Sequence, residues 1–196
     1  KTPPVRGGEE GDLLAIGGPA GLQSLLLNGE GSFDSRKDGL DEDRDGLAVV
    51  AEQLGEYFAG ERDEFDLRLD PHGTEFQRAV WQALREIPYG QTRSYGQIAA
   101  AVARPRAARA VGGANNRNPI AVIVPCHRVI GAGGAMVGYA GGLDRKSWLL
   151  GHERGHGPAQ DRGAVGNAAD LDPPPDQRCD VEDPEGKRVA VLRLEF

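Results

Sequence analysis

The stretch GTEFQRAVWQALREIPYGQTRSYGQIAAAVARPRAARAVGGANNRNP, residues 73–119, decides how this chain folds. Two segments within it, TEFQ at 74–77 and SYGQ at 94–97, match the capping box that opens an α-helix. Apolar residues follow each box at helical spacing, and a Pro-Tyr-Gly turn at 88–90 and Pro105 interrupt the two patterns. The stretch therefore predicts two helices, each of which begins at a capping box.

Residues 107–116 predict a third helix, which carries Arg109 and otherwise consists mainly of alanine and glycine. Two short helices joined by a tight turn are typical of a helix-turn-helix unit. Because its side chains are small, the backbone of the second helix can lie unusually close to a partner. The same pattern would suit two helices packed in a core, so the residues alone leave both interpretations open.

The residues before this stretch predict a small α+β unit. Apolar runs at 13–16 and 22–27, separated by Gly-Gly-Pro-Ala-Gly, are typical of a β-hairpin. Apolar residues then recur at helical spacing over 47–58, and they alternate with charged residues over 65–69, as in a half-buried strand. We therefore expect an N-terminal α+β domain over residues 1–72, with a polar, acidic surface loop between the hairpin and the helix.

The segments that follow residue 119 predict more helix and loop. Residues 120–124 form an apolar run too short to classify, the glycine-rich residues 131–142 predict a turning loop, and residues 144–152 predict a last helix. We therefore expect a second, mostly helical domain over 73–153 that contains the helix-turn-helix. The predicted fold class is α+β.

Composition changes again after Glu153. Residues 154–196 are rich in glycine, aspartate, alanine and proline, and they predict a polar, disordered tail. The end of this tail, residues 189–196, is apolar enough to form a strand, but its partner cannot be named from the sequence. The tail is therefore expected to lie outside the two domains.

The overall composition, with 39% apolar and 27% charged residues, is ordinary for a globular protein. No apolar run is long enough to span a membrane and no signal segment opens the chain, so we expect a cytoplasmic protein. The two cysteines, Cys126 and Cys179, lie far apart in different contexts. This argues against a disulfide framework and against a cysteine-based zinc site.

The net charge of −7 conceals an uneven distribution. Residues 73–153 contain 10 Lys and Arg against 4 Asp and Glu, whereas residues 1–72 contain 7 against 17 and residues 154–196 contain 6 against 9. Because phosphate binding depends on local charge, the basic middle segment is compatible with a nucleic-acid partner. An ordinary solvated surface would explain the same charges.

Cys126 lies in the segment Pro-Cys-His-Arg at 125–128. A thiol is a weak nucleophile until it is deprotonated, and a neighbouring imidazole or guanidinium can favour the thiolate. His127 would need a partner to orient its ring, and Glu153 is a candidate. A cysteine hydrolase is another interpretation, but adjacent residues seldom form a good catalytic pair unaided, and no oxyanion-hole motif stands out.

The segment PCHRVI at 125–130 resembles the signature of the O6-alkylguanine-DNA alkyltransferases, also called methylated-DNA–protein-cysteine methyltransferases. The segments GTEFQRAVWQALREIPYGQTRSYGQIA, RAARAVGGANNRNPI and VGYAGGLDRKSWLLGHE are similar to that family's pattern, in its order and at its spacing. The resemblance is dense over 73–153, weaker over 11–70, and does not extend to 154–196.

The resemblance implies a DNA repair enzyme that moves a methyl or other alkyl group from O6-alkylguanine, and also from O4-alkylthymine, to Cys126. Each molecule would act once and irreversibly, after flipping the base through the minor groove. The implied partner is double-stranded DNA containing the alkylated base, with no membrane and no cofactor, and we expect a monomer. Some relatives bind zinc in the N-terminal domain, but residues 1–72 contain no cysteine and only His72, so no metal is expected.

The resemblance also implies catalytic roles for five residues. Cys126 would accept the alkyl group, His127 would be its general base through a bound water, and Glu153 would hold the imidazole. Asn118 would brace the active-site turn. Tyr95 would rotate the target phosphate and donate a proton toward the departing guanine.

Binding roles follow in the same way. Arg109 would enter the duplex and fill the gap left by the flipped base. The backbone carbonyls of Cys126 and Val129 would accept from the guanine amine, and Tyr139 and Ala140 would close the pocket. The remaining expected DNA contacts are Tyr95, Ala107, Ala110, Gly112, Gly113 and Arg128.

Two features bear on these expectations. A related class of proteins binds alkylated DNA without chemistry and replaces the acceptor cysteine, usually with tryptophan, so Cys126 argues for activity. A helix-turn-helix protein that binds DNA without alkyl transfer is the other alternative. Ala103 lies where the family commonly has glycine, at the corner between the two helices. The backbone geometry of that corner is therefore expected to differ locally from the family's.

Overall fold

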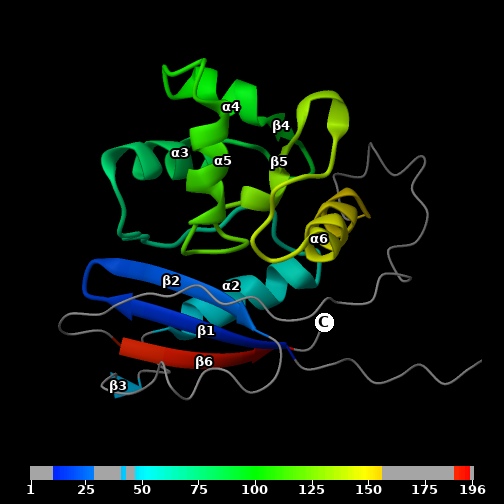
Figure 1. Cartoon of the computed structure of the whole chain (residues 1–196). Helices are drawn as coiled ribbons and strands as arrows, with labels where there is room; N and C mark the ends of the chain where they lie inside the picture. The colour runs from blue at the N-terminus through cyan, green and yellow to red at the C-terminus, as the bar shows by residue number, and fades with distance from the viewer. Residues whose placement is uncertain (1–10, 29–40, 43–46, 156–187, 195–196) are drawn as a thin grey trace, which may run out of the picture.

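The computed structural model of this chain describes residues 11–28, 41–42, 47–155 and 188–194. A helical part containing α3, α4, α5 and α6 lies on one side of a small sheet that is packed against α2 (Figure 1). This arrangement confirms the predicted α+β class.

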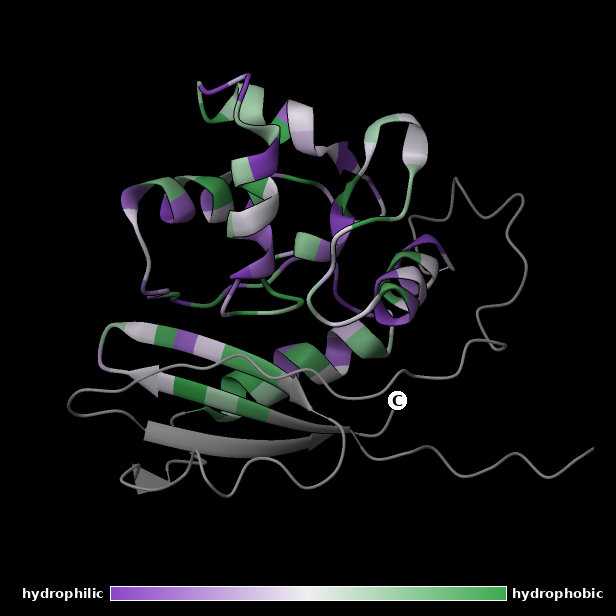
Figure 2. Cartoon of the chain, in the orientation of Figure 1, coloured by the Kyte–Doolittle hydropathy of each residue, from purple (hydrophilic) through white to green (hydrophobic). Residues whose placement is uncertain are grey.

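The N-terminal hairpin forms as predicted. Strand β1 (Gly11–Gly18) pairs antiparallel with β2 (Gly21–Asn28), with a register shift between Ile16 and Gly17. Helix α2 (Ala48–Phe58) follows, and hydrophobic and polar residues alternate along it (Figure 2). Its buried side chains include Leu54 and Tyr57, which join the same hydrophobic cluster as Leu25 of the hairpin.

The C-terminal residues complete this sheet. Strand β6 (Arg188–Leu194) pairs antiparallel with β1, and the two-residue strand β3 (Asp41–Glu42) pairs parallel with β6, so the strand order is β2-β1-β6-β3. The predicted terminal strand is thus confirmed, and β1 is its partner. The expected disordered tail is wrong for 188–194, because the open edge of β1 offers backbone groups that these residues pair with. The rest of 154–196 after Gly155 lies outside the described residues.

The half-buried strand predicted over Phe65, Leu67 and Leu69 does not form. Only an isolated bridge joins Leu69 to Leu22 of β2. The side chain of Gln53 on α2 takes the two backbone groups of Asp66, donating to its carbonyl at 3.0 Å and accepting from its N–H at 2.9 Å. These bonds replace the ladder pairs that a longer strand would need.

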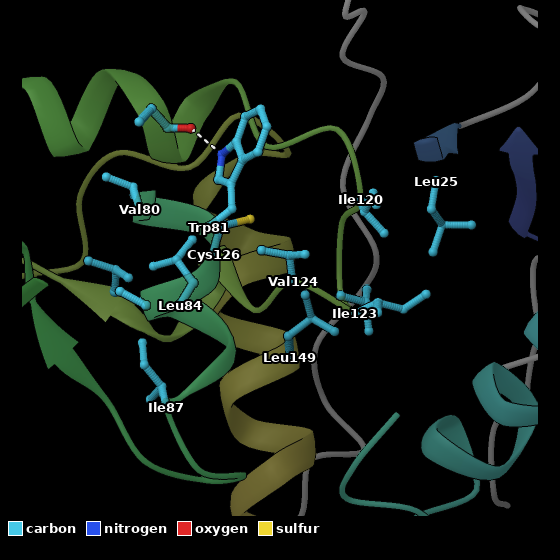
Figure 3. Close-up of a cluster of buried hydrophobic side chains, with 14 of the residues drawn as sticks. Leu25, Val80, Trp81, Leu84, Ile87, Ile120, Ile123, Val124, Cys126 and Leu149 are labelled. Atoms are coloured by element: carbon cyan, nitrogen blue, oxygen red, sulfur yellow. Dashed lines mark hydrogen bonds between the residues drawn. The ribbon is translucent and has the colours of Figure 1, made fainter. Parts of the chain in front are cut away.

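The helices of the second part begin where the capping boxes predict. Helices α3 (Glu75–Arg85) and α4 (Tyr95–Ala101) each have a complete box, and α5 (Ala108–Asn116) packs against both. The indole of Trp81 donates to the Ala114 carbonyl at 2.9 Å, which fastens α3 to α5 (Figure 3). The last helix, α6 (Leu143–Gly155), is also confirmed.

Two short pairings bring the remaining segments together. Strand β4 (Arg93–Ser94) pairs parallel with β5 (Val129–Ile130), which places the start of α4 beside the residues that follow the 3₁₀ turn η1 (Cys126–Arg128). A second 3₁₀ turn, η2 (Ala132–Gly134), lies in the predicted glycine-rich loop.

The unclassified run 120–124 proves to be a turn that joins the hairpin to the helical part. The Leu25 N–H donates to the Pro119 carbonyl at 2.8 Å, and the Ala121 N–H donates to the Leu25 carbonyl at 3.2 Å. Leu25 lies near Ile120 and Ile123 in the buried cluster (Figure 3). Backbone bonds as well as apolar contacts therefore join the two parts.

We expect Ala103→Gly to raise the free energy of unfolding by about 0.5–1 kcal/mol. Ala103 has φ +57°, which an L-residue adopts at a cost of about 1–2 kcal/mol, partly offset by the greater freedom of glycine in the unfolded chain. Urea denaturation measures the change. Ala100→Gly, at an exposed position inside α4, is the control and should lower stability by about 1 kcal/mol. Equal destabilisation by both substitutions would contradict the argument.

We expect deletion of residues 188–196 to lower the free energy of unfolding by about 2 kcal/mol or more, because β1 loses its backbone partners along a whole edge. The exposed edge should also favour self-association. Chemical denaturation and sedimentation velocity test both effects, with deletion of only 195–196 as the control. Unchanged stability after the longer deletion would show that β6 contributes nothing to the sheet.

Candidate active site

Cys126 opens the turn η1 and is almost fully buried. The Asn118 amide donates to its Sγ at 3.1 Å and to the Val124 carbonyl at 2.8 Å, while the Asn118 Oδ1 accepts from the Ile120 N–H at 3.1 Å. One side chain therefore fixes both the turn and the sulfur. Figure 3 shows Cys126 within the apolar cluster, close to Trp81 and Val124.

The environment of Cys126 keeps its sulfur protonated. Burial raises the pKa of the thiol, and the hydrogen bond from Asn118 and the charge of Lys146 only partly oppose this effect. The sequence-based idea that a neighbouring cation favours the thiolate is therefore not realised in this structure. The sulfur needs a base at the moment of reaction.

His127, the predicted base, follows Cys126 in the turn η1. Its side chain is fully buried, and its Nε2 lies 2.7 Å from Glu153 Oε1. Burial lowers the pKa of His127, so the imidazole is neutral near pH 7 and donates its Nε2–H to the carboxylate. Its Nδ1 is buried and has no hydrogen-bond partner among the described residues, which leaves a lone pair free.

Glu153 on α6 holds this arrangement together. Burial alone would raise the pKa of its carboxyl, but the hydrogen bonds and charges of His127 and Arg128 lower that pKa to about 2. The carboxylate also accepts from the Tyr57 hydroxyl at 2.8 Å and from the Gly90 N–H at 3.0 Å. It is therefore ionised at neutral pH although it is fully buried.

The structure does not favour the DNA contact predicted for Arg128. The side chain is only 5% exposed, and its Nε and Nη2 donate to Glu153 at 2.9–3.0 Å. Its Nη1 donates to the Ile87 carbonyl at 2.6 Å, and the guanidinium lies over the ring of Tyr89. The buried carboxylate needs a cation beside it, and this requirement keeps Arg128 away from the surface.

Lys146 on α6 is a residue that the sequence reasoning missed. It is fully buried, and its ammonium donates to the backbone carbonyls of Val129 and Val137. Burial lowers the pKa of Lys146. No sequence signal distinguishes this lysine from the surface cations around it, because its partners are backbone carbonyls, which any residue supplies.

The two carbonyls predicted to accept from guanine already have partners. The Val129 carbonyl accepts from Lys146, and the Cys126 carbonyl accepts from the Asn115 amide at 3.3 Å. The Cys126 carbonyl also accepts from the Val129 N–H, so both of its lone pairs are engaged, and a guanine amine would have to share or displace one of these donors.

Tyr95 and Tyr139 both lie near the sulfur. The Tyr95 hydroxyl, at the start of α4, donates toward the Gly138 carbonyl at 2.8 Å, and burial and then the Cys126 thiol raise its pKa. Tyr139 is buried, and the same two causes raise its pKa well above the usual value. Gly138 has φ +62°, and a Cβ there would come within 2.8 Å of the Tyr95 hydroxyl, so this loop needs glycine. Ala140 follows in the same loop and is half-buried.

The predicted DNA-contact residues of α5 fall into two groups. Arg109 and Ala110 are exposed, whereas Ala107, Gly112 and Gly113 are half-buried. A Cβ on Gly112 would lie 3.8 Å from the Tyr95 ring, so this glycine lets Tyr95 pack closely against α5. Residues 95–118 contain no acidic side chain, and their exposed cations are Arg104, Arg106, Arg109 and Arg117.

No group of three His, Cys, Asp or Glu side chains in the described ranges lies close enough together to hold a metal ion. No helix in the same part of the chain is long and apolar enough to cross a membrane.

Comparison with known proteins agrees with this geometry. Residues 75–155 match the family described as 6-O-methylguanine DNA methyltransferase, DNA binding domain. The chain is 54% identical over 147 residues to the methylated-DNA–protein-cysteine methyltransferase of Mycolicibacterium paratuberculosis, an alignment that covers 75% of this chain and 89% of the relative.

Solved structures give the same result. The O6-methylguanine methyltransferase of Mycobacterium tuberculosis superposes with a TM-score of 0.64 at 51% identity, over 70% of this chain and 83% of that protein. A crystal structure of Mycobacterium tuberculosis OGT in complex with DNA superposes with a TM-score of 0.61 at 46% identity, over 74% and 89% of the two chains. The chain therefore belongs to the methylated-DNA–protein-cysteine methyltransferase family.

Proposed function

We propose that this DNA-repair methyltransferase uses Cys126 as its acceptor and removes the alkyl group from O6-alkylguanine in duplex DNA. The observation that carries the proposal is a buried thiol adjacent to a neutral imidazole, which an ionised carboxylate orients. Cys126, His127 and Glu153 together supply a nucleophile, a base and a partner for the base. No cofactor is needed for this reaction.

The transfer is a single displacement. The Cys126 proton passes to His127 Nδ1 through a bridging water while a bond forms from Sγ to the alkyl carbon and the bond from that carbon to guanine O6 breaks. The departing guanine takes a proton from the Tyr95 hydroxyl, and solvent exchange restores the phenol and the neutral imidazole. Since the pKa of Tyr95 is raised, its hydroxyl is protonated and available as the donor. The product is a thioether, which is stable, so each molecule acts once.

The helix-turn-helix supports binding to DNA. A base stacked in a duplex cannot reach a buried sulfur, so it must be flipped out at a cost of a few kcal/mol. The exposed Arg109 on α5 can fill the gap that the base leaves, and the small residues around it let the helix enter the minor groove. The basic, acid-free surface of residues 95–118 attracts phosphates whatever the base sequence.

Three finer points belong to the same proposal. We infer that O4-alkylthymine is also a substrate, because it presents the same alkyl–oxygen bond. The protein would act as a monomer, since each molecule carries a complete set of reacting groups. Its compartment would be the one that holds the DNA, which is the cytoplasm in bacterial and archaeal cells.

The alternative is a protein that binds alkylated DNA without chemistry. It would need the helix-turn-helix but not the Cys126, His127 and Glu153 arrangement. The presence of Cys126 favours catalysis, because the silent binders replace the acceptor cysteine.

We expect one methyl group to appear on the peptide that contains Cys126 after incubation with a duplex carrying one O6-methylguanine. Peptide mass analysis measures the site, and the yield should not exceed one methyl per molecule, because the thioether is stable. Cys126→Ser should bind the duplex without becoming methylated, whereas Cys179→Ser should react like the unaltered protein. An unmodified Cys126 with normal DNA binding would instead support the silent binder.

We expect Arg109→Ala to slow repair of duplex DNA by about tenfold or more, because the flipped-out state loses the side chain that replaces the base. The reaction with free O6-methylguanine base should be unchanged, since no duplex has to open. Arg117→Ala, which removes another exposed cation from the end of the same helix, is the matched control. Equal losses for both variants would indicate general electrostatic attraction rather than insertion.

A further inference from the structure

We propose that Tyr57, on α2 of the N-terminal part, is a positioning residue for alkyl transfer that holds the Glu153 carboxylate against His127. The inference rests on the proposed function, because it gives that site one more member. Tyr57 lies outside residues 75–155, which match the family's DNA-binding domain. It would make the N-terminal part a contributor to the chemistry.

The contact is direct and fully buried. The Tyr57 hydroxyl lies 2.8 Å from Glu153 Oε1, the same oxygen that lies 2.7 Å from His127 Nε2. Burial raises the pKa of Tyr57 well above the usual value, so the phenol stays protonated and donates its hydrogen to the carboxylate. The phenol and the imidazole therefore share one acceptor oxygen.

A second bond fixes the backbone of Tyr57 to the same turn of α6. His152 Nε2 lies 2.8 Å from the Tyr57 carbonyl, and the His152 ring stacks on Trp148 with centroids 5.2 Å apart. The adjacent residues His152 and Glu153 thus contact the two ends of Tyr57. Aromatic rings surround its own ring; they belong to Phe58, Phe65, Tyr89 and His152. Tyr57 cannot move without disturbing α6.

The phenol sets how strongly Glu153 attracts a proton on His127. A carboxylate oxygen that accepts from a phenol has less negative charge to offer the imidazole, so the imidazolium is less stabilised. Removing the phenol should therefore raise the pKa of His127. The other titratable groups that face Glu153 and His127 remain in place: Tyr89 from the loop after α3, Cys126 and Arg128 from η1, and Lys146 from α6.

Removing the Tyr57 hydroxyl should slow alkyl transfer. The base form of His127 is the reactive one, so a higher pKa leaves less of it at any pH below neutral. The acid limb of the rate profile should then move to higher pH, by about half a unit to one unit for the loss of one hydrogen bond. Looser positioning of the ring should slow the reaction further at all pH values.

The test compares Tyr57→Phe with Tyr89→Phe in single-turnover transfer from a duplex containing O6-methylguanine, between about pH 5 and 9. Both substitutions remove a phenol oxygen from the same aromatic cluster and keep the ring. The Tyr89 hydroxyl is buried without a hydrogen-bond partner in the described part of the chain, so it is a matched control. We expect Tyr57→Phe to react about fivefold to tenfold more slowly below neutral pH, with unchanged DNA affinity, and Tyr89→Phe to react like the unaltered protein.

Three further experiments keep the outcome decisive. Imidazole NMR titration of the free protein should show a higher pKa of His127 in Tyr57→Phe only, and thermal denaturation shows whether each variant is folded. In a Glu153→Gln background, Tyr57→Phe should have no further effect on the rate profile. An unshifted acid limb in folded Tyr57→Phe, or an equal shift in Tyr89→Phe, would overturn the proposal. If the unaltered protein itself fails to methylate Cys126, it is the proposed function that fails.

Discussion

The buried charge of Glu153 is the constraint on which the active-site half of the molecule depends. An ionised carboxylate inside a protein is costly unless donors surround it. Here the donors come from α2, the loop after α3 and the turn η1, through Tyr57, Gly90, His127 and Arg128, and they meet the carboxylate on α6. Four segments that are distant in sequence are therefore held at one point, and without the carboxylate Arg128 would remain as an uncompensated buried cation.

This constraint also explains why Cys126 is a thiol at rest. The guanidinium of Arg128, two residues after Cys126, is bonded to Glu153, so it does not stabilise a thiolate. Burial then keeps the sulfur neutral, and a neutral buried thiol reacts slowly with oxidants and stray electrophiles. A protein that reacts once is lost if its thiol reacts with anything other than its substrate, so a slowly reacting thiol preserves it. In the proposed mechanism the proton leaves Cys126 for His127 only when a substrate alkyl group is in place.

Local signals were enough to predict much of the fold. The capping boxes at Thr74 and Ser94 and the hairpin turn depend on neighbours within a few residues, and all of them form. The errors concern partners far away in sequence. Periodicity indicated which face of a segment is apolar, but it could not show that Gln53 would take the backbone of Asp66, or that Arg128 would be buried.

The same distinction applies to the site. The Pro-Cys-His-Arg segment itself indicated Cys126 and His127, with Glu153 as a candidate partner, and the family resemblance added Asn118 and the individual roles. Tyr57 was predicted only as part of an apolar helix face, because the phenol's partner lies 96 residues away. Lys146 was missed for a similar reason. The sequence does not show which partner the polar atom of a buried side chain will bond to, because the fold determines that partner.

The N-terminal part contributes buried apolar residues and also contacts the segments that carry the active-site residues. Its hairpin bonds to Pro119 and Ala121 through Leu25, which fixes the turn that follows Asn118. Its helix α2 reaches Glu153 through Tyr57. The sheet that supports both contacts includes β6 from the far end of the chain. The hairpin thus holds the turn that follows Asn118, the residue that contacts the sulfur, and α2 holds Glu153, the residue that orients His127, so both side chains beside the turn η1 are supported from the N-terminal part.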